Sequence, residues 1–202
     1  MEEIWNYFGN IDIYLFDQIQ KGRFDPGMKI LDAGCGSGRN LIYFMREGYT
    51  VYGVDNIPFA IDEIKRLISK NHFNVPESNF TLENVEQMSF ADETFDVVIS
   101  SAVLHFAENE SHFYAMMDEM WRVLKKGGML FARLGTDKGI EKYVKSLGDG
   151  KFTLPEGAKW FLVNDTMIYE LANRLNAKFL EPLKTTNVEN KRCMATLVWG
   201  KN

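Results

Sequence analysis

Between positions 30 and 40 the chain carries the sequence Ile30-Leu31-Asp32-Ala33-Gly34-Cys35-Gly36-Ser37-Gly38-Arg39-Asn40. Apolar residues lead into an acidic residue, and three glycines then follow at alternate positions. Glycine tolerates positive φ and leaves the main chain bare, so a ligand can lie directly against such a turn. The run predicts a buried strand that turns tightly into a helix, whose first N–H groups can bind a small molecule. Open α/β sheets bind their ligands at this place, the carboxyl end of a strand.

Outward from this turn, short apolar runs alternate with amphipathic segments, which is typical of βαβ units and a parallel sheet covered by helices on both faces. We predict strands at 28–32, 50–54, 80–82, 95–100 and 129–134. Helices are expected at 2–21, 39–47, 58–70, 111–124 and 164–176. The final segments, 178–186 and 192–199, favour an antiparallel hairpin at one sheet edge, whereas residues 135–159 are polar and irregular.

Composition excludes several classes of protein. With 202 residues, a net charge of −5 and a pI near 5.3, the chain suits one domain and lacks the general positive field of a nucleic-acid-binding protein. No apolar run is long enough for a membrane span, and the acidic start does not resemble a signal peptide. Cys35 and Cys193 lie too far apart in sequence for a disulfide framework or a zinc site. We therefore expect a cytoplasmic protein with no metal, no membrane contact and no nucleic-acid partner.

The glycine spacing separates this turn from two other ligand-binding loops. A dinucleotide-binding fold would show G-x-G-x-x-G, but Arg39 stands where the third glycine would fall. A P-loop would end in Gly-Lys-Ser/Thr, and none follows Gly38. Asp32 beside the loop would repel a pyrophosphate and attract a cationic amino group.

Two further positions follow predicted strands and suit a nucleoside. Asp55 could accept hydrogen bonds from both hydroxyls of a ribose, as acids do in dinucleotide folds, or could simply favour the following helix N-terminus. The Asn84 amide could accept from an adenine amino group while Val85 packs on the ring. The alternative for Asn84 is an ordinary turn asparagine.

Five segments, taken in order, resemble the motifs of class I S-adenosylmethionine-dependent methyltransferases: 30–40, 51–55, 84–92, 95–100 and 121–128. The resemblance covers about residues 25–134. It implies an enzyme whose cofactor is S-adenosylmethionine. It also implies a doubly wound, mostly parallel seven-stranded sheet with helices on both faces and an antiparallel last strand.

The same resemblance implies roles for individual residues. Gly34 and Gly36 would approach the methionine moiety, Asp32 would orient its amino group, and Asp55 would hold the ribose. The adenine would pack on Ile57. The whole cofactor-binding set expected on this basis is Asp32, Gly34, Cys35, Gly36, Arg39, Asp55, Asn56, Ile57, Asn84, Val85 and Ser100. The chain departs from the family at Asn84, where an aspartate is common.

Segments 38–44, 48–51 and 192–198 are similar to small-molecule methyltransferases of the tellurite-resistance and thiopurine type, so the expected partner is a small-molecule methyl acceptor. His105 is the candidate catalytic base. The alternatives for His105 are lining the pocket or packing under a helix. Arg39 could steer an anionic substrate or a cofactor carboxylate, or could be solvated.

We expect one domain over residues 1–202, with an N-terminal helical lid at 1–24, a cofactor-binding core at 25–134, and an insert, helix and closing hairpin at 135–202. The lid would use Trp5, Tyr7, Phe8 and Tyr14 to exclude water. Three other functions remain open at this point. They are a non-catalytic S-adenosylmethionine or S-adenosylhomocysteine sensor, a protein or nucleic-acid methyltransferase, and a nicotinamide oxidoreductase.

Overall fold

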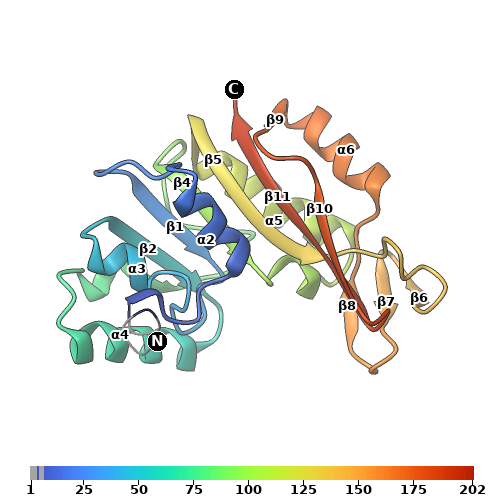
Figure 1. Cartoon of the computed structure of the whole chain (residues 1–202), viewed down its shortest axis with the longest axis horizontal. Coiled ribbons are helices and arrows are strands. Elements are labelled where there is room, and N and C mark those ends of the chain that lie inside the picture. Colours follow the sequence, from blue (N-terminus) through green and yellow to red (C-terminus); the bar gives the residue numbers. More distant parts are fainter. Residues whose placement is uncertain (1–3, 5–6) are drawn as a thin grey trace.

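The computed structural model describes residue 4 and residues 7–202 of the chain. Its central sheet has the strand order β10-β11-β5-β4-β1-β2-β3, and a short strand, β9, pairs with β11 (Figure 1). The bounds are β1 Lys29–Ala33, β2 Thr50–Asp55, β3 Phe80–Leu82, β4 Phe95–Ser101, β5 Leu124–Gly135, β9 Ala177–Phe179, β10 Lys184–Val188 and β11 Arg192–Lys201.

Strands β1 to β5 pair in parallel, and β11 pairs antiparallel with β5, β9 and β10. This arrangement confirms the predicted doubly wound sheet and its antiparallel last strand. The sheet order reverses direction between β1 and β4, so the carboxyl ends of β1, β2 and β4 meet at one edge, where ligands bind in this architecture. The loop after β1 is the glycine-rich turn.

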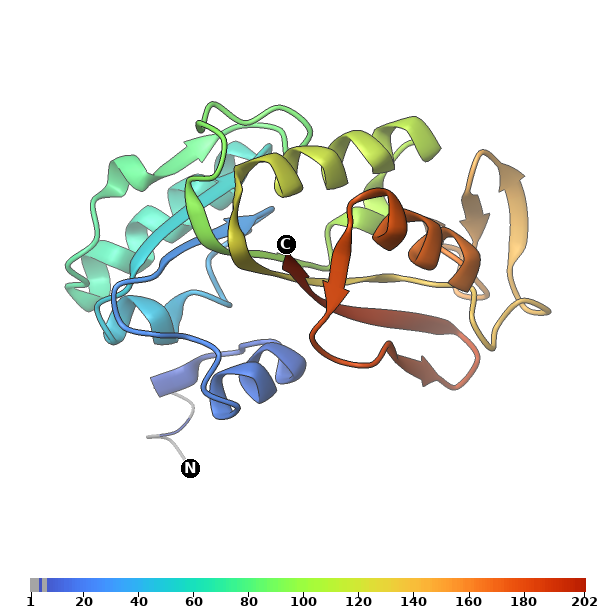
Figure 2. The ribbon, with the colours of Figure 1, turned by 90° about the horizontal axis from the view of Figure 1, so that it is seen from above.

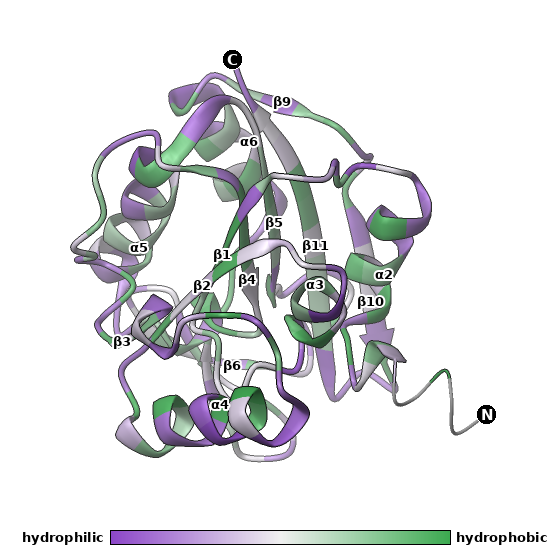
Figure 3. Cartoon of the chain, turned by 90° about the vertical axis from the view of Figure 1, so that its left-hand side faces the viewer, coloured by the Kyte–Doolittle hydropathy of each residue, from purple (hydrophilic) through white to green (hydrophobic). Residues whose placement is uncertain are grey.

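Helices cover both faces of the sheet, as Figure 2 shows for α2 and α5 on opposite sides. One face packs α5 and α6 through residues such as Phe113, Met117 and Leu171. The other packs α2, α3 and α4 through residues that include Phe44 and Ile64. The helices are α2 Ile13–Gln20, α3 Ile42–Arg46, α4 Pro58–Asn71, α5 Glu110–Val123 and α6 Asp165–Arg174, with short 3₁₀ turns η1 Glu77–Asn79 and η2 Leu104–Phe106. Hydrophobic residues gather on the central strands, and α4 alternates between apolar and polar residues (Figure 3).

The prediction of one helix over residues 2–21 is wrong for residues 9–12. Gly9 has φ +63°, a left-handed conformation that favours glycine, and it lies against the end of the Ile42 side chain in α3, so the helix is interrupted here. Asp12 then caps α2 by accepting a hydrogen bond from the Tyr14 N–H at 3.0 Å. Trp5 lies outside the described residues.

Three other segments differ from expectation. The irregular stretch after β5 contains a small antiparallel sheet of β6 Lys145–Gly148, β7 Lys151–Thr153 and β8 Lys159–Phe161. The strand expected at 178–186 is divided between β9 and β10, which both pair with β11. The helix expected at 39–47 is shortened to α3, because the Leu41 N–H donates to the Gly38 carbonyl and continues the turn.

Candidate active site

The glycine-rich loop after β1 is anchored to the neighbouring strand. The N–H groups of Gly34 and Cys35 both donate to the Val54 carbonyl at 2.9 Å. Gly34 has φ +82°, and a Cβ there would lie 2.4 Å from Val103 Cγ2, so the position is restricted by both backbone and space. Gly36 differs, because a Cβ added there meets no atom within 4 Å. The open space above Gly36 is the cavity that a ligand would fill.

The second strand supplies a carboxylate that is already held in place. Asp55 Oδ2 accepts a hydrogen bond from the Gly36 N–H at 2.8 Å, and Oδ1 accepts one from the Ile57 N–H at 3.0 Å. Both oxygens keep a further lone pair that can accept from hydroxyl donors. The side chain therefore lies with a fixed orientation at the wall of the cavity, as a ribose-binding acid requires.

Asp32, at the carboxyl end of β1, is 1% exposed and neither of its carboxylate oxygens has a hydrogen-bond partner. Burial raises the pKa of Asp32 to about 8. The positive charge of Arg39 and, to a smaller extent, the neighbouring Asn40 side chain oppose this effect, and the negative charge of Asp55 adds to it. A buried carboxyl without a partner is costly, and a cationic group would relieve that cost. A cationic group placed beside Asp32 would favour its ionised form.

Arg39 follows the loop and points toward the end of β4. Its Nη2 donates to Ser101 Oγ at 3.0 Å, and its Nη1 donates to the Asn10 carbonyl at 3.2 Å. The guanidinium is partly exposed and lines the cavity. It is therefore placed to meet an anionic group within hydrogen-bonding reach of the loop.

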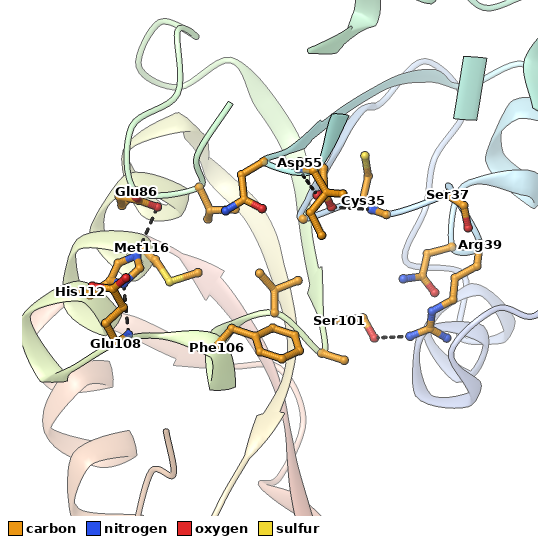
Figure 4. A pocket seen from close by; sticks show the side chains of 18 residues that line it. Cys35, Ser37, Arg39, Asp55, Glu86, Ser101, Phe106, Glu108, His112 and Met116 are labelled. Carbon is orange, nitrogen blue, oxygen red and sulfur yellow. Dashed lines mark hydrogen bonds and ion pairs between the residues drawn. The ribbon is translucent and has the colours of Figure 1, made fainter. Parts of the chain in front are cut away.

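These residues enclose a cavity of about 590 Å³ (Figure 4). In the figure, Ser37 and Arg39 lie at one end, Asp55 lies between the ends, and Glu86 and His112 lie at the other. The complete lining is Gly34, Cys35, Gly36, Ser37, Arg39, Asn40, Asp55, Asn56, Ile57, Val85, Glu86, Ser101, Ala102, Val103, Phe106, Glu108, His112 and Met116. This volume lies within the range of small-molecule sites.

Most residues of the expected cofactor set line this cavity together: Gly34, Cys35, Gly36, Arg39, Asp55, Asn56, Ile57 and Val85. Asp32 is buried and is absent from the lining. Asn84 is exposed and its carbonyl accepts from the Gln87 N–H in a turn. Ser100 is fully buried, and its neighbour Ser101 lines the cavity instead. The role that the family resemblance implies for Ser100 is a backbone contact at the end of β4, and it stays a prediction.

His105 also lies outside the cavity lining. It is 3% exposed, and its ring stacks on Trp160 with centroids 4.1 Å apart. Burial, with a smaller effect from the charge of Lys151, lowers the pKa of His105 to about 4. Nδ1 has no hydrogen-bond partner. The imidazole is therefore neutral at pH 7, and its expected catalytic role stays a prediction.

Sequence reasoning missed one end of the cavity. His112 and Met116 lie one turn apart near the start of α5, and His112 Nε2 is 3.3 Å from Glu86 Oε2. His112 Nδ1 accepts from the Glu108 N–H at 3.2 Å. Helical spacing alone places such residues on a common face but does not show whether that face meets core or cavity. No pattern in the sequence distinguishes the two.

Among the described residues, none of the helices has the length and apolar character needed to cross a membrane. The same residues contain no group of three or more His, Cys, Asp or Glu side chains suited to a metal ion.

Known proteins share this fold and sequence pattern. The profile of the methyltransferase domain family matches residues 31–132. An uncharacterized methyltransferase of Bacillus subtilis, YodH, is 32% identical over 124 residues, which are 61% of this chain and 49% of that protein. The chain thus spans about half the length of this relative.

Two solved structures show the same fold. TehB from Haemophilus influenzae superposes with a TM-score of 0.71 at 20% identity, over 95% of this chain and 63% of that chain. The 1,6-didemethyltoxoflavin N1-methyltransferase of Burkholderia thailandensis, solved with bound 1,6-didemethyltoxoflavin and S-adenosylhomocysteine, superposes with a TM-score of 0.70 at 15% identity. That match covers 100% of this chain and 82% of the other.

Proposed function

This chain belongs to the methyltransferase domain family, and from that premise we propose that it transfers a methyl group from S-adenosylmethionine to a small-molecule acceptor. The observation that supports the proposal most directly is the set of groups around Gly36. A bare loop, the fixed carboxylate of Asp55 and the guanidinium of Arg39 line one cavity, and the buried carboxyl of Asp32 lies beside the loop at the end of β1. Each matches a different part of S-adenosylmethionine.

The residues fit this cofactor group by group. The ammonium of its methionine part would favour the ionised form of Asp32, and Arg39 suits the carboxylate. Asp55 would accept from the ribose hydroxyls. Ile57, which is 56% exposed and lines the cavity, and Val85 would pack on the adenine. The exposed position of Asn84 makes Glu86 the better acceptor for the adenine amino group, since Glu86 lines the cavity.

When bound, S-adenosylmethionine supplies a methyl group already activated by a sulfonium centre. The protein then has three tasks: to hold the acceptor in line, to exclude water and to receive a proton where the acceptor carries one. Phe106, 64% exposed on η2 and part of the cavity lining, offers an apolar surface to an acceptor. No Ser-His-Asp or Cys-His pair is required, because a soft or ionised nucleophile attacks without a base.

A small-molecule acceptor is supported by the volume of the cavity and by the 1,6-didemethyltoxoflavin bound in the Burkholderia structure of the same fold. A net charge of −5 disfavours a nucleic-acid acceptor. We propose a soft or heteroatom nucleophile such as a thiolate or chalcogenide. A sensor that binds the cofactor without chemistry is the second candidate, because the histidine that lines the cavity, His112, is already engaged with Glu86 and Glu108.

Two measurements test the proposal. Calorimetric titration with S-adenosylhomocysteine should give saturable one-site binding, whereas nicotinamide dinucleotide should give none. Incubation with S-adenosylmethionine and a panel of small thiols and chalcogenides should then release S-adenosylhomocysteine. Binding without turnover across the panel would favour the sensor, and no binding at millimolar ligand would reject both.

A further inference from the structure

We propose that Asp12 is a positioning residue of the cofactor site, which fixes Arg39 and Ser101, so that residues 9–12 support the methionine end of the cavity from outside its lining. This inference rests on the proposed function, because it assumes that Arg39 and its surroundings receive the amino-acid part of the cofactor. We call residues 9–12 the N-terminal strap. The strap precedes α2 and lies far in sequence from the loop that it contacts.

The two carboxylate oxygens of Asp12 make different contacts. Its Oδ1 accepts from the Tyr14 N–H, which is ordinary helix capping. Its Oδ2 accepts from Ser101 Oγ and from Arg133 Nη1, both at 3.0 Å, and lies 4.0 Å from Arg39 Nη2. Capping needs only one oxygen and is served equally by serine or asparagine. The second oxygen therefore has a separate purpose, directed at residues of the cavity.

Because the Asp12 carboxylate is buried, its ion pairs differ from those at the protein surface. The Asp12 side chain is fully buried, while the Arg39 and Arg133 side chains are 38% and 23% exposed. A buried carboxylate is stable only with good partners, and here the partners are two guanidinium groups and a hydroxyl. Ser101 also receives the Arg39 Nη2 hydrogen bond, so Asp12, Ser101 and Arg39 form one connected chain of polar contacts ending in the cavity.

The backbone of the strap adds independent contacts to the same loop. The Asp12 N–H donates to Asn40 Oδ1 at 3.0 Å, and the Asn10 carbonyl accepts from Arg39 Nη1 at 3.2 Å. Gly9 approaches Ile42 so closely that a Cβ there would lie 2.5 Å from Ile42 Cδ1. The strap thus contacts the Arg39 side of the cavity through Gly9, Asn10 and Asp12. None of these contacts reaches the ribose or adenine end.

That one-sided placement gives a test that separates positioning from general stability. S-adenosylhomocysteine carries the amino-acid part, and 5′-methylthioadenosine lacks it. We expect Asp12→Asn to weaken S-adenosylhomocysteine binding about tenfold in calorimetric titrations, as for the loss of one charged contact. Binding of 5′-methylthioadenosine should change less than about twofold. Asp17→Asn, on the exposed side of α2 next to Lys21 and Lys184, is the matched control and should leave both affinities unchanged.

A double-mutant cycle adds a readout that a structural defect would not produce. If Asp12 acts through Arg39, then Asp12→Asn should have little further effect on S-adenosylhomocysteine binding in an Arg39→Met background. Additive losses, or an equal loss for both nucleosides in Asp12→Asn, would overturn the inference. Wild-type protein that binds neither nucleoside would instead overturn the proposed function.

Should Asp12→Asn fail to fold, Ser101→Ala tests the same connection, because it removes the hydroxyl that joins Asp12 to Arg39. The expected result is again a selective loss of S-adenosylhomocysteine binding. Unchanged binding of both nucleosides by a folded Ser101→Ala variant would contradict the proposal.

Discussion

The N–H of Gly36 donates a 2.8 Å hydrogen bond to Oδ2 of Asp55, which joins the glycine-rich loop after β1 to the acid at the end of β2. The bond places a fixed carboxylate beside bare main chain without any ligand. Two neighbouring parallel strands produce this meeting, since Ala33 pairs with Val54 in register. A ligand that spans both groups therefore meets a surface that needs little rearrangement.

Replacing this acid should weaken cofactor binding strongly. Asp55→Ala removes charge-assisted hydrogen bonds worth about 1.5–3 kcal/mol, which corresponds to about a tenfold to hundredfold loss of S-adenosylhomocysteine affinity. Calorimetric titration measures the change. Asp62→Ala, on an exposed position of α4, is the control and should bind like the wild type. Unchanged affinity in Asp55→Ala would remove the ribose role from this residue.

In Gly36→Ala the methyl group of alanine should fit into the open space beside residue 36. It would then occupy space that the ligand needs. Gly36 has φ +51°, so alanine there costs about 1–2 kcal/mol for the left-handed backbone and meets no side chain. We expect Gly36→Ala to fold and to lose S-adenosylhomocysteine binding. Gly34→Ala provides the contrast, because its Cβ would lie 2.4 Å from Val103 and should lower stability severely. Thermal melts with and without ligand separate the two effects, and full binding by Gly36→Ala would show that the ligand lies elsewhere.

We expect Asp32 to lower the stability of the folded protein at high pH and to strengthen cofactor binding. Its folded-state pKa, about 8, lies above the ordinary value of 3.8, so its stabilising contribution is complete only below about pH 4 and is lost as pH rises toward 8. Asp32→Asn should therefore stabilise the protein at pH 8, by about 1–3 kcal/mol, and gain little at pH 4. Urea unfolding at both pH values measures this gain. The same variant should bind S-adenosylhomocysteine more weakly, and a loss of stability at pH 8 in Asp32→Asn would contradict the assignment.

Cofactor binding should also release a proton. Asp32 with a pKa of about 8 is mostly protonated at pH 7, and an ammonium beside it would favour the ionised form. We expect S-adenosylhomocysteine binding at pH 7 to release close to one proton, falling toward none above pH 9. Titrations in buffers of different ionisation enthalpy count these protons. The release should disappear in Asp32→Asn; if it persists there, another group carries the proton.

His105 should make stability fall in mild acid. Its folded-state pKa of about 4 is below the ordinary value of 6.5, so the unfolded chain binds a proton first as pH falls from 6.5. Lowering the pH from 7 to 5 should cost the wild type about 2 kcal/mol through this group. His105→Gln, compared with the exposed control His72→Gln, should lose that part of the pH dependence in urea unfolding. An identical pH dependence in wild type and His105→Gln would show that this imidazole is not buried in the neutral form.

The turnover rate of His105→Gln tests whether His105 acts as the catalytic base. A base that touches the acceptor would lower kcat without changing S-adenosylhomocysteine affinity. A packing role through Trp160 would instead lower stability and leave kcat per folded molecule similar.

Some residues of the candidate site could be predicted from the sequence and others could not, depending on whether the features that place them are local. Asp32, Gly34 and Asp55 could be found from the sequence because strand ends and glycine turns are local features. Ser101 illustrates the limit for strands, since a shift of one residue moves a side chain to the other face. The pair of Glu86 and His112 could not be predicted, because it joins a turn after β3 to the first turns of α5.

The sequence by itself determined the order of strands and helices over residues 25–134, the glycine turn and the two acids beside it, because these follow from spacing over a few neighbouring residues. Tertiary structure alone decided that Asp12 reaches Ser101 and Arg133, at separations of 89 and 121 residues. It also decided that His105 stacks inside the protein while His112 lines the cavity. The physical reason is that such contacts depend on which faces of distant elements pack together, and that information is spread over the whole chain.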